Sequence, residues 1–161
     1  METAPIPVRL SDENATAALA RRLAPMLRPG DFIALSGDLG AGKTTFARAL
    51  LRALGSSDEV PSPTFTLIQT YDTAKGRVSH FDLYRIAHPD ELTELGWDEA
   101  QNGIVLAEWP ERAGPFLPAR RLDVALGLAG ETARHATLQP RGGWDRDRDG
   151  FAAVQRAAGA E

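Results

Sequence analysis

The stretch Gly37-Asp38-Leu39-Gly40-Ala41-Gly42-Lys43-Thr44 decides what this chain folds into. It matches the P-loop pattern G-x-x-x-x-G-K-[ST], whose glycine residues let backbone N–H groups converge on phosphate oxygens. An apolar run over residues 31–36 precedes the stretch and predicts a buried strand. Apolar residues at helical spacing over 46–54 follow it, up to Gly55. A strand, a glycine-rich turn and a helix in this order predict a nucleotide-binding site.

The residues of this loop and of the first helical turn have expected roles in binding a nucleotide. We expect nucleotide contacts along the whole segment, from Asp38, Leu39, Gly40, Ala41, Gly42, Lys43, Thr44 and Thr45. The Lys43 ammonium would reach the β- and γ-phosphates, and the Thr44 hydroxyl would coordinate Mg²⁺. The N-terminus of the helix adds a partial positive charge that favours the same anion.

Length, charge and cysteine content limit the class of protein. With 161 residues, of which 43% are hydrophobic and 25% charged, the chain has the size and composition of one globular domain. Its net charge of −4 argues against a free-standing nucleic-acid binder, so any role in RNA chemistry is expected to run through a protein partner. The sequence has no cysteine, no secretory signal and no apolar run of membrane-spanning length. We therefore expect a cytoplasmic protein without a membrane partner.

The order of the predicted elements is that of an α/β fold with a single P-loop NTPase domain: a mixed, mostly parallel central sheet with helices on both faces. Strands are expected at 8–10, 31–36, 64–71, 77–84, 104–107, 122–128 and 134–139, and helices from Ser11 or Asp12 to about 27, at 46–54 and at 88–96. Pro25 is expected to kink the first helix or to end it early. The strands at 64–71 and 77–84 form an inserted antiparallel hairpin.

A composition change divides the chain near residue 140. We assign residues 1–140 to the P-loop domain. Residues 141–161 begin with alternating charges and few apolar side chains. We expect this segment to be a mobile tail, with room for a short helix at its end.

Glu108 is the first candidate for the chemistry that a P-loop does not supply by itself. Hydrolysis needs a group that holds the water shell of the metal and a group that orients the attacking water. Glu108 directly follows the apolar strand at 104–107, and ligands of open α/β sheets gather at the carboxyl ends of strands. The alternative is a solvated acid at a strand end.

Asp82 is the second candidate. Strand alternation places its side chain on the same face as His80 and Tyr84. From that position the carboxylate would touch Mg²⁺ or a bound water. The alternative is a salt bridge to Arg85 or Arg77, and spacing alone does not decide between the two.

Three further features have both a functional and a structural interpretation. A threonine hydroxyl in the proline-restrained segment 62–66 would sense the γ-phosphate through Mg²⁺ as part of a switch, or would simply lead into a strand. Trp109 would stack on a base, dock a partner or pack in the core. His80, His88 and His135 are too scattered along the chain for a metal site, and Mg²⁺ prefers oxygen ligands.

Four blocks of sequence occur in order within roughly residues 8–140. They are Gly37-Asp38-Leu39-Gly40-Ala41-Gly42-Lys43-Thr44-Thr45, Ser62-Pro63-Thr64-Phe65-Thr66, His80-Phe81-Asp82-Leu83-Tyr84-Arg85 and Glu108-Trp109-Pro110-Glu111-Arg112. In order and spacing they closely resemble the TsaE (also called YjeE) family, the ATPase component of bacterial tRNA threonylcarbamoyladenosine synthesis. A P-loop alone is shared by many families, whereas the four blocks together are highly specific.

The resemblance implies a small α/β domain with a mixed sheet that binds ATP or ADP with Mg²⁺ and hydrolyses ATP slowly. It also implies two related partner proteins, of the TsaD and TsaB type. One of them is the transferase that moves threonylcarbamoyl to adenosine beside the anticodon of tRNAs reading codons that start with A. The ATPase would reset that machine between turnovers and would meet tRNA only indirectly.

The resemblance also assigns roles to single residues. Lys43 would bind phosphate, Thr44 and Glu108 would serve the metal and the water, and Asp82 would be a further active-site acid. Thr64 with Phe65 would belong to the switch. One departure is visible, since Asn14-Ala15-Thr16 stands where many relatives have a glutamate close to the threonine. How the N-terminal segment meets the adenine is therefore left open.

Three other functions share a P-loop. A small-molecule kinase needs an acceptor pocket and usually an arginine-bearing lid, and no later stretch has the pattern of a lid helix with paired arginines. A GTPase would carry N-K-x-D, which is absent, and the one D-x-x-G lies at 147–150 in the predicted tail. A nucleotide-gated interaction module is closer to the favoured interpretation, since a slow ATPase that regulates partners is partly such a module. No arginine finger is obvious, although Arg85 and Arg112 are candidates.

Overall fold

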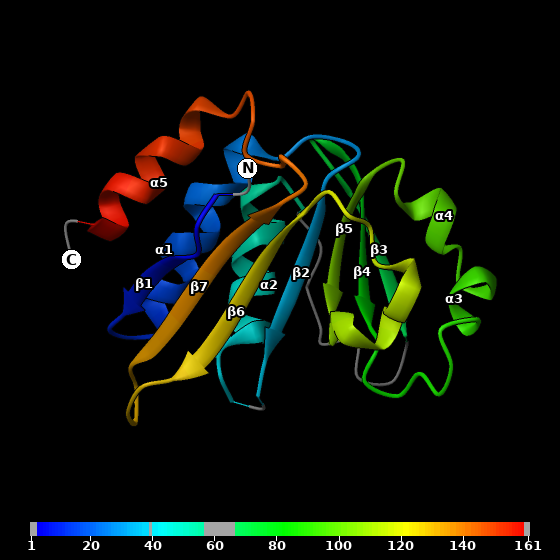
Figure 1. The fold of residues 1–161 in the computed structure, drawn as a ribbon, viewed down its shortest axis with the longest axis horizontal. Helices are drawn as coiled ribbons and strands as arrows, with labels where there is room; N and C mark the ends of the chain where they lie inside the picture. The colour runs from blue at the N-terminus through cyan, green and yellow to red at the C-terminus, as the bar shows by residue number, and fades with distance from the viewer. Residues whose placement is uncertain (1–2, 39, 57–66, 160–161) are drawn as a thin grey trace.

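The computed structural model describes residues 3–38, 40–56 and 67–159, in which seven strands form one mixed sheet (Figure 1). The strands are β1 (Ile6–Leu10), β2 (Phe32–Gly37), β3 (Ile68–Thr73), β4 (Gly76–Asp82), β5 (Ile104–Glu108), β6 (Arg121–Leu128) and β7 (Arg134–Arg141). Their order across the sheet is β1-β7-β6-β2-β5-β4-β3. The central strands β6, β2, β5 and β4 are parallel, and β1, β7 and β3 pair antiparallel at the two edges. The predicted α/β class with an antiparallel hairpin, β3–β4, is confirmed.

Helices cover both faces of this sheet. They are α1 (Glu13–Leu23), α2 (Lys43–Ala53), α3 (Glu91–Glu94), α4 (Trp97–Ala100) and α5 (Asp149–Gly159), with the 3₁₀ segments η1 (Ala24–Met26) and η2 (Pro110–Phe116). Side chains of α1, α2 and α5 belong to one hydrophobic core, and those of α3, α4 and η2 belong to a second core on the opposite face. None of the helices in the described ranges is long and apolar enough to cross a membrane.

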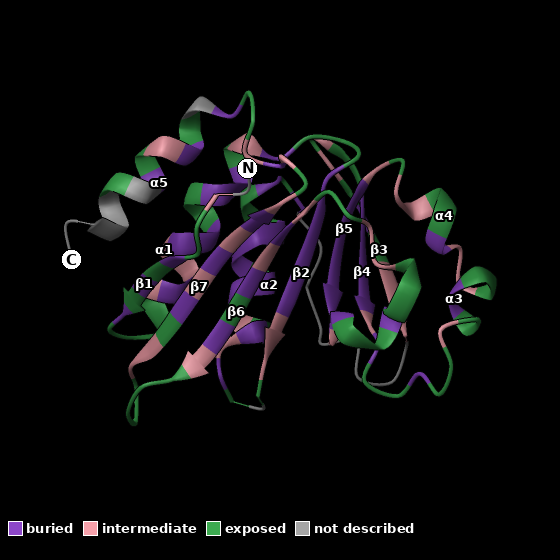
Figure 2. Cartoon of the chain, in the orientation of Figure 1, coloured by how far each residue is buried: buried purple, intermediate pink, exposed green. Residues whose placement is uncertain are grey.

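The central strands are buried on both faces, as Figure 2 shows. Along β2, Ile33 and Leu35 enter the core under α1 and α2, while Phe32 and Ala34 enter the other. All five residues of β5 are buried, and this double covering accounts for its continuous apolar sequence. The strand nevertheless ends on a carboxylate, Glu108, which brings an acid to the edge of the core.

All three predicted helices differ in extent from those observed, and α2 begins three residues before the predicted start. The first ends two residues before Pro25 and continues as η1, because a proline has no backbone N–H for the α-helical ladder. The predicted helix over 88–96 contains only the single turn α3. Gly96 then takes a left-handed conformation (φ 77°), and α4 begins after it. The strand predicted at 64–71 is observed from Ile68, and its first residues lie outside the described ranges.

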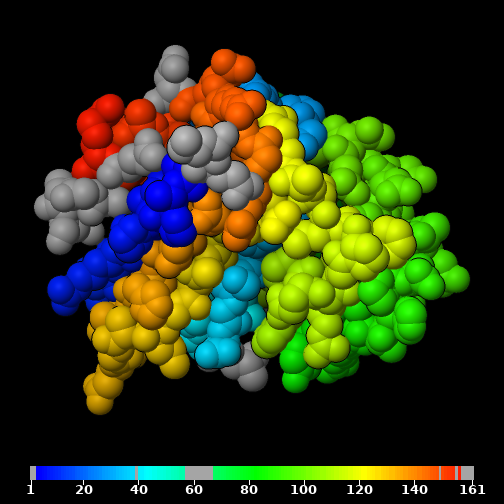
Figure 3. Space-filling view, viewed as in Figure 1, coloured from blue at the N-terminus to red at the C-terminus, as the bar shows by residue number. Residues whose placement is uncertain are grey.

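The segment after β7 is packed onto the body, so the prediction of a mobile tail is wrong. Trp144, Phe151 and Val154 lie in the same hydrophobic core as α1 and α2. The guanidinium of Arg148 is buried and pairs with the carboxylate of Asp31. Figure 3 shows the N-terminal strand, in blue, beside the orange and red C-terminal part. The three largest apolar residues of the segment are buried although charged residues surround them, and composition does not report this.

Candidate active site

The P-loop joins the carboxyl end of β2 to the first turn of α2. Gly42, directly before α2, has a φ of 105°, a left-handed conformation that glycine adopts freely and other residues adopt with strain. Gly37, the last residue of β2, allows a close approach, since a Cβ there would lie 2.5 Å from the carbonyl oxygen of Leu126 on β6. Both glycines are therefore required by the path of the backbone, which is the path that phosphate binding needs.

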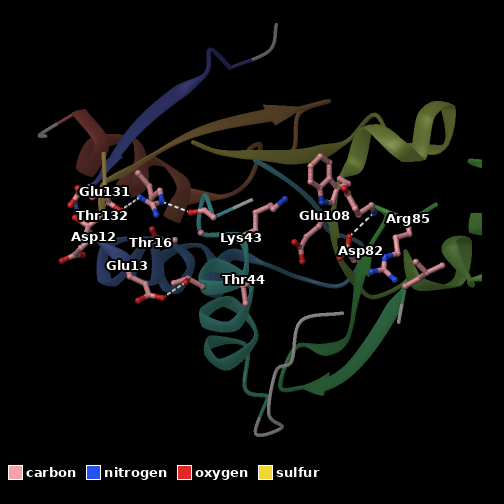
Figure 4. Close-up of a pocket in the computed structure, with 17 residues that line it drawn as sticks. Asp12, Glu13, Thr16, Lys43, Thr44, Asp82, Arg85, Glu108, Glu131 and Thr132 are labelled. Atoms are coloured by element: carbon pink, nitrogen blue, oxygen red, sulfur yellow. Dashed lines mark hydrogen bonds between the residues drawn. The ribbon is translucent and has the colours of Figure 1, made fainter. Parts of the chain in front are cut away.

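A pocket of about 710 Å³ lies over this loop (Figure 4). From the predicted site its lining brings together Gly40, Gly42, Lys43, Thr44, Thr45, Asp82, Glu108 and Trp109. Asp38 is exposed and Ala41 is buried in the core, and neither contributes to the lining. Leu39, Thr64 and Phe65, which we predicted for nucleotide binding and for the switch, lie outside the described residues.

Lys43 is a buried cation at the floor of the pocket. Its side chain leaves the first residue of α2, and the residue is 7% exposed. Nζ donates a hydrogen bond of 2.6 Å to the carbonyl oxygen of Gly37, and it lies 4.1 Å from the centre of the Trp109 ring. Both contacts are with neutral groups. A buried ammonium held by neutral partners at a helix N-terminus is suited to receive an anion.

Two carboxylates meet at the carboxyl edge of neighbouring parallel strands. In the register of β4 and β5, Asp82 lies opposite Glu108. Oε2 of Glu108 is 2.7 Å from Nε2 of His80. Partial burial raises the pKa of Asp82, and the negative charge of Glu108 raises this pKa further. The backbone N–H of Tyr84 lowers the pKa, because it donates a hydrogen bond of 3.1 Å to Oδ1 of Asp82. The net direction is upward, so Asp82 is a weaker acid than an exposed aspartate.

The structure shows where the arginines lie that the sequence offered as salt-bridge partners of Asp82 or as arginine fingers. Arg77 pairs instead with Asp72, at 3.7 Å on the exposed hairpin. Arg85 lines the pocket together with Asp82, and Arg112 is exposed and does not.

Trp109 combines the two interpretations that the sequence left open. Its backbone has φ 56° and ψ 51°, a left-handed conformation that costs free energy in any residue other than glycine. The ring is partly buried against the core formed with α3 and α4, yet it also lines the pocket. On the pocket side it lies over Lys43, and its centre is 5.0 Å from that of Tyr84.

Two distant segments supply the far end of the pocket; the sequence left the contact of the N-terminal segment open and did not predict the other. Asp12, Glu13 and Thr16 come from the start of α1, Glu131 and Thr132 come from the β6–β7 turn, and Arg134 is the first residue of β7. Figure 4 shows the two groups facing each other, away from Glu108 and Asp82. Glu13 accepts a hydrogen bond from the Thr45 hydroxyl at 2.8 Å, and Arg134 Nε donates to Gly40 at 3.1 Å. No local sequence pattern predicts such long-range contacts.

The oxygen groups of the pocket fit Mg²⁺. Thr44 offers an exposed hydroxyl, and Glu108 and Asp82 offer carboxylates, the hard ligands that this ion prefers. The described ranges contain no group of three or more histidine, aspartate or glutamate side chains that could hold a metal alone.

Comparisons with known proteins identify the family. The sequence model of the family described as Threonylcarbamoyl adenosine biosynthesis protein TsaE matches residues 10–136. The tRNA threonylcarbamoyladenosine biosynthesis protein TsaE of Rickettsia felis is 42% identical over 131 residues, which cover 80% of this chain and 77% of the relative. The protein of the same name in Bacillus subtilis is 39% identical over 132 residues, covering 81% and 82%.

A solved structure extends the similarity to the whole chain. The crystal structure of Bacillus subtilis YdiB has a TM-score of 0.78 and 32% sequence identity, and covers 98% of this chain and 97% of that one. The two relatives named above both carry the TsaE description, which favours the resemblance over the small-molecule kinase alternative. The chain therefore belongs to the TsaE family of threonylcarbamoyl adenosine biosynthesis proteins.

Proposed function

We propose that this chain is a cytoplasmic P-loop ATPase that binds ATP or ADP with Mg²⁺, hydrolyses ATP slowly and serves tRNA threonylcarbamoyladenosine modification. One observation carries the proposal: Lys43, at the N-terminus of α2, shares a single pocket with the carboxylates of Asp82 and Glu108. A cation with a helix N-terminus binds phosphates, and acids beside them supply what hydrolysis needs in addition. The names of the relatives support the pathway.

Each residue of the pocket has a distinct task in this proposal. Lys43 exchanges its contacts with Gly37 and Trp109 for oxygens of the β- and γ-phosphates. Thr44 and Glu108 would hold Mg²⁺, which when bound neutralises part of the phosphate charge. Glu108 and Asp82, at the edge of β5 and β4, hold and orient water beside the terminal phosphate.

We expect slow turnover by the chain alone. Arg134 is the arginine next to the phosphate-binding loop, but its Nε is bound to the loop carbonyl of Gly40, and its Nη1 donates to carbonyls of its own turn. It therefore shapes the loop and is not directed at a phosphate. Arg85 also lines the pocket, beside Asp82. We propose that the charge that develops on the phosphate oxygens is stabilised mainly by groups from outside the chain.

That help is proposed to come from two partner proteins. They are the threonylcarbamoyltransferase subunit, of the TsaD type, and its paralogous partner, of the TsaB type. The net charge of −4 supports indirect contact with tRNA, since direct binding of a phosphate backbone favours a basic protein. The ATPase would then reset the transferase between turnovers.

The test is ATP hydrolysis by the purified chain, alone and with both partners, beside Lys43→Ala. We expect a slow basal rate, stimulation by the partners, and loss of both in the variant. Lys75→Ala is the matched control, because Lys75 lies in the β3–β4 turn and binds the carbonyls of Pro25 and Leu27 outside the pocket. A basal rate of about 1–100 s⁻¹, as in kinases, would contradict partner dependence. ATP binding without stimulation would contradict the proposed partners.

A further inference from the structure

A buried histidine supports Glu108 from inside the sheet. Nε2 of His80 lies 2.7 Å from Oε2 of Glu108, and the two side chains are 1% and 9% exposed. Because Asp82 is opposite Glu108 in the register of β4 and β5, His80 is two residues deeper on the same face. Glu108 lines the pocket and His80 does not, so the imidazole touches the acid without reaching a nucleotide.

The partner of the ring indicates which nitrogen carries the proton. An ionised carboxylate only accepts hydrogen bonds, so Nε2–H is the donor. In the neutral ring Nδ1 is then a bare acceptor, and within the described part of the chain it is buried without a hydrogen-bond partner. An unpaired buried acceptor is unfavourable for folding. If His80 served packing alone, an apolar side chain at this buried position would be more favourable. The hydrogen bond to Glu108 is the interaction that a histidine makes there and an apolar residue does not.

We propose that His80 is a positioning residue for Glu108, an inference that rests on the proposed ATPase function. The bond occupies Oε2 and holds the carboxylate in one orientation, which leaves Oε1 for water or metal at the pocket. Lys43 lines the same pocket, and its positive charge would attract a carboxylate that was free to turn. His80 thereby keeps the acid of the site apart from the cation that must bind phosphate.

Two substitutions separate this role from simple packing. In His80→Gln the amide nitrogen can reach the position of Nε2, whereas in His80→Asn it reaches only the position of Nδ1. Both variants place a neutral amide in the same buried space. We expect His80→Asn to lower kcat for ATP hydrolysis about 10–100-fold, the usual effect of losing a partner of an active-site ligand. We expect His80→Gln to recover most of this loss, with the Kd for ATP changed less than about two-fold in both.

A double-mutant cycle then tests whether His80 acts through Glu108. In a Glu108→Gln background, His80→Asn should lower kcat by less than about two-fold further, because the acid that it positions is gone. An equal loss in both backgrounds would overturn the inference. If Glu108→Gln by itself left hydrolysis unchanged, the proposed function of Glu108 would fail instead, and the two failures are thereby distinguished.

The third measurement needs no variant and no turnover. Chemical shifts of the imidazole nitrogens of His80, measured by NMR on the folded chain labelled with ¹⁵N-histidine, report which nitrogen is protonated. We expect the Nε2–H tautomer, assigned by comparison with His88 and His135, which are exposed. An Nδ1–H tautomer would make Nε2 an acceptor, which cannot hold an ionised carboxylate, and would overturn the proposal even if His80→Asn did not fold.

Discussion

Replacing Arg148 with methionine is expected to lower the free energy of unfolding by about 3–5 kcal/mol. The guanidinium connects the segment before α5 to the body of the protein. Nη1 lies 2.7 Å from Oδ2 of Asp31, and Nη2 contacts Oδ1 of the same carboxylate. Nη1 also donates to the carbonyl of Met26 and Nε to that of Trp144, each at 2.6 Å.

The magnitude follows from what the substitution leaves behind. Both charged side chains are almost fully buried, at 1% for Arg148 and 2% for Asp31. Without the guanidinium, Asp31 keeps the backbone N–H of Arg28 at 2.8 Å but has lost its counterion. Removing one member of a buried pair costs about 3–5 kcal/mol, mainly through the charge left unpaired. Against a total stability of about 5–15 kcal/mol, the variant should still fold.

The assay is urea denaturation at pH 7, followed by circular dichroism. The control is Arg146→Met in the same segment, where the exposed residue should change stability by no more than about 0.5 kcal/mol. The double variant with Asp31→Asn should be more stable than Arg148→Met alone, because no buried charge is then unpaired. A loss below about 1 kcal/mol for Arg148→Met would refute the reasoning, since residues 144–154 would not belong to the cooperative unit.

Three other predictions concern the pocket. The folded state raises the pKa of Asp82, so the protonated carboxyl stabilises the fold below the ordinary pKa of 3.8, and this stabilisation is lost as pH rises through the pKa of the folded state. The neutral amide of Asp82→Asn should therefore raise Tm more at pH 7 than at pH 4. An increase in Tm that does not depend on pH would contradict this reasoning. Gly37→Ala places a Cβ 2.5 Å from the carbonyl oxygen of Leu126, and should cost about 1–3 kcal/mol in urea denaturation and weaken ATP binding in a titration. Arg134→Gln removes the hydrogen bond to the carbonyl of Gly40 and should weaken ATP binding by about 5–10-fold in the same titration. Arg9→Gln, on the exposed side of the neighbouring strand β1, should leave ATP binding unchanged. Equal ATP affinities of the two variants would contradict a loop-shaping role for Arg134.

The parts of the fold that local chemistry dictates could be predicted from the sequence. The strand, turn and helix around the P-loop each have their own signal in hydrophobic period or glycine placement, and all three were found where expected. The antiparallel hairpin at the sheet edge was predicted from β-branched residues flanking a turn at Gly76. Glu108 was predicted because an acid that follows an apolar run marks the end of a buried strand.

The rest depends on pairs of residues that are distant along the chain. Alternation placed His80 on one face with Asp82, but its bond to Glu108 depends on the register of β4 against β5. The packing of Trp144 depends on a core assembled from α1 and α2, so a charge-rich neighbourhood was misleading. Arg134 reaches the P-loop only because β6 lies beside β2 in the sheet.

The contact between Arg134 and the carbonyl of Gly40 spans 94 residues, and this separation has a consequence for synthesis. A ribosome adds about 5–20 residues per second, so Arg134 and the β6–β7 turn leave the exit tunnel about 5–20 s after Gly40. During that interval β2 also lacks its neighbour β6. The pocket is therefore incomplete on the growing chain, and a ligand that contacts both of its ends can stabilise the protein only after β7 has emerged.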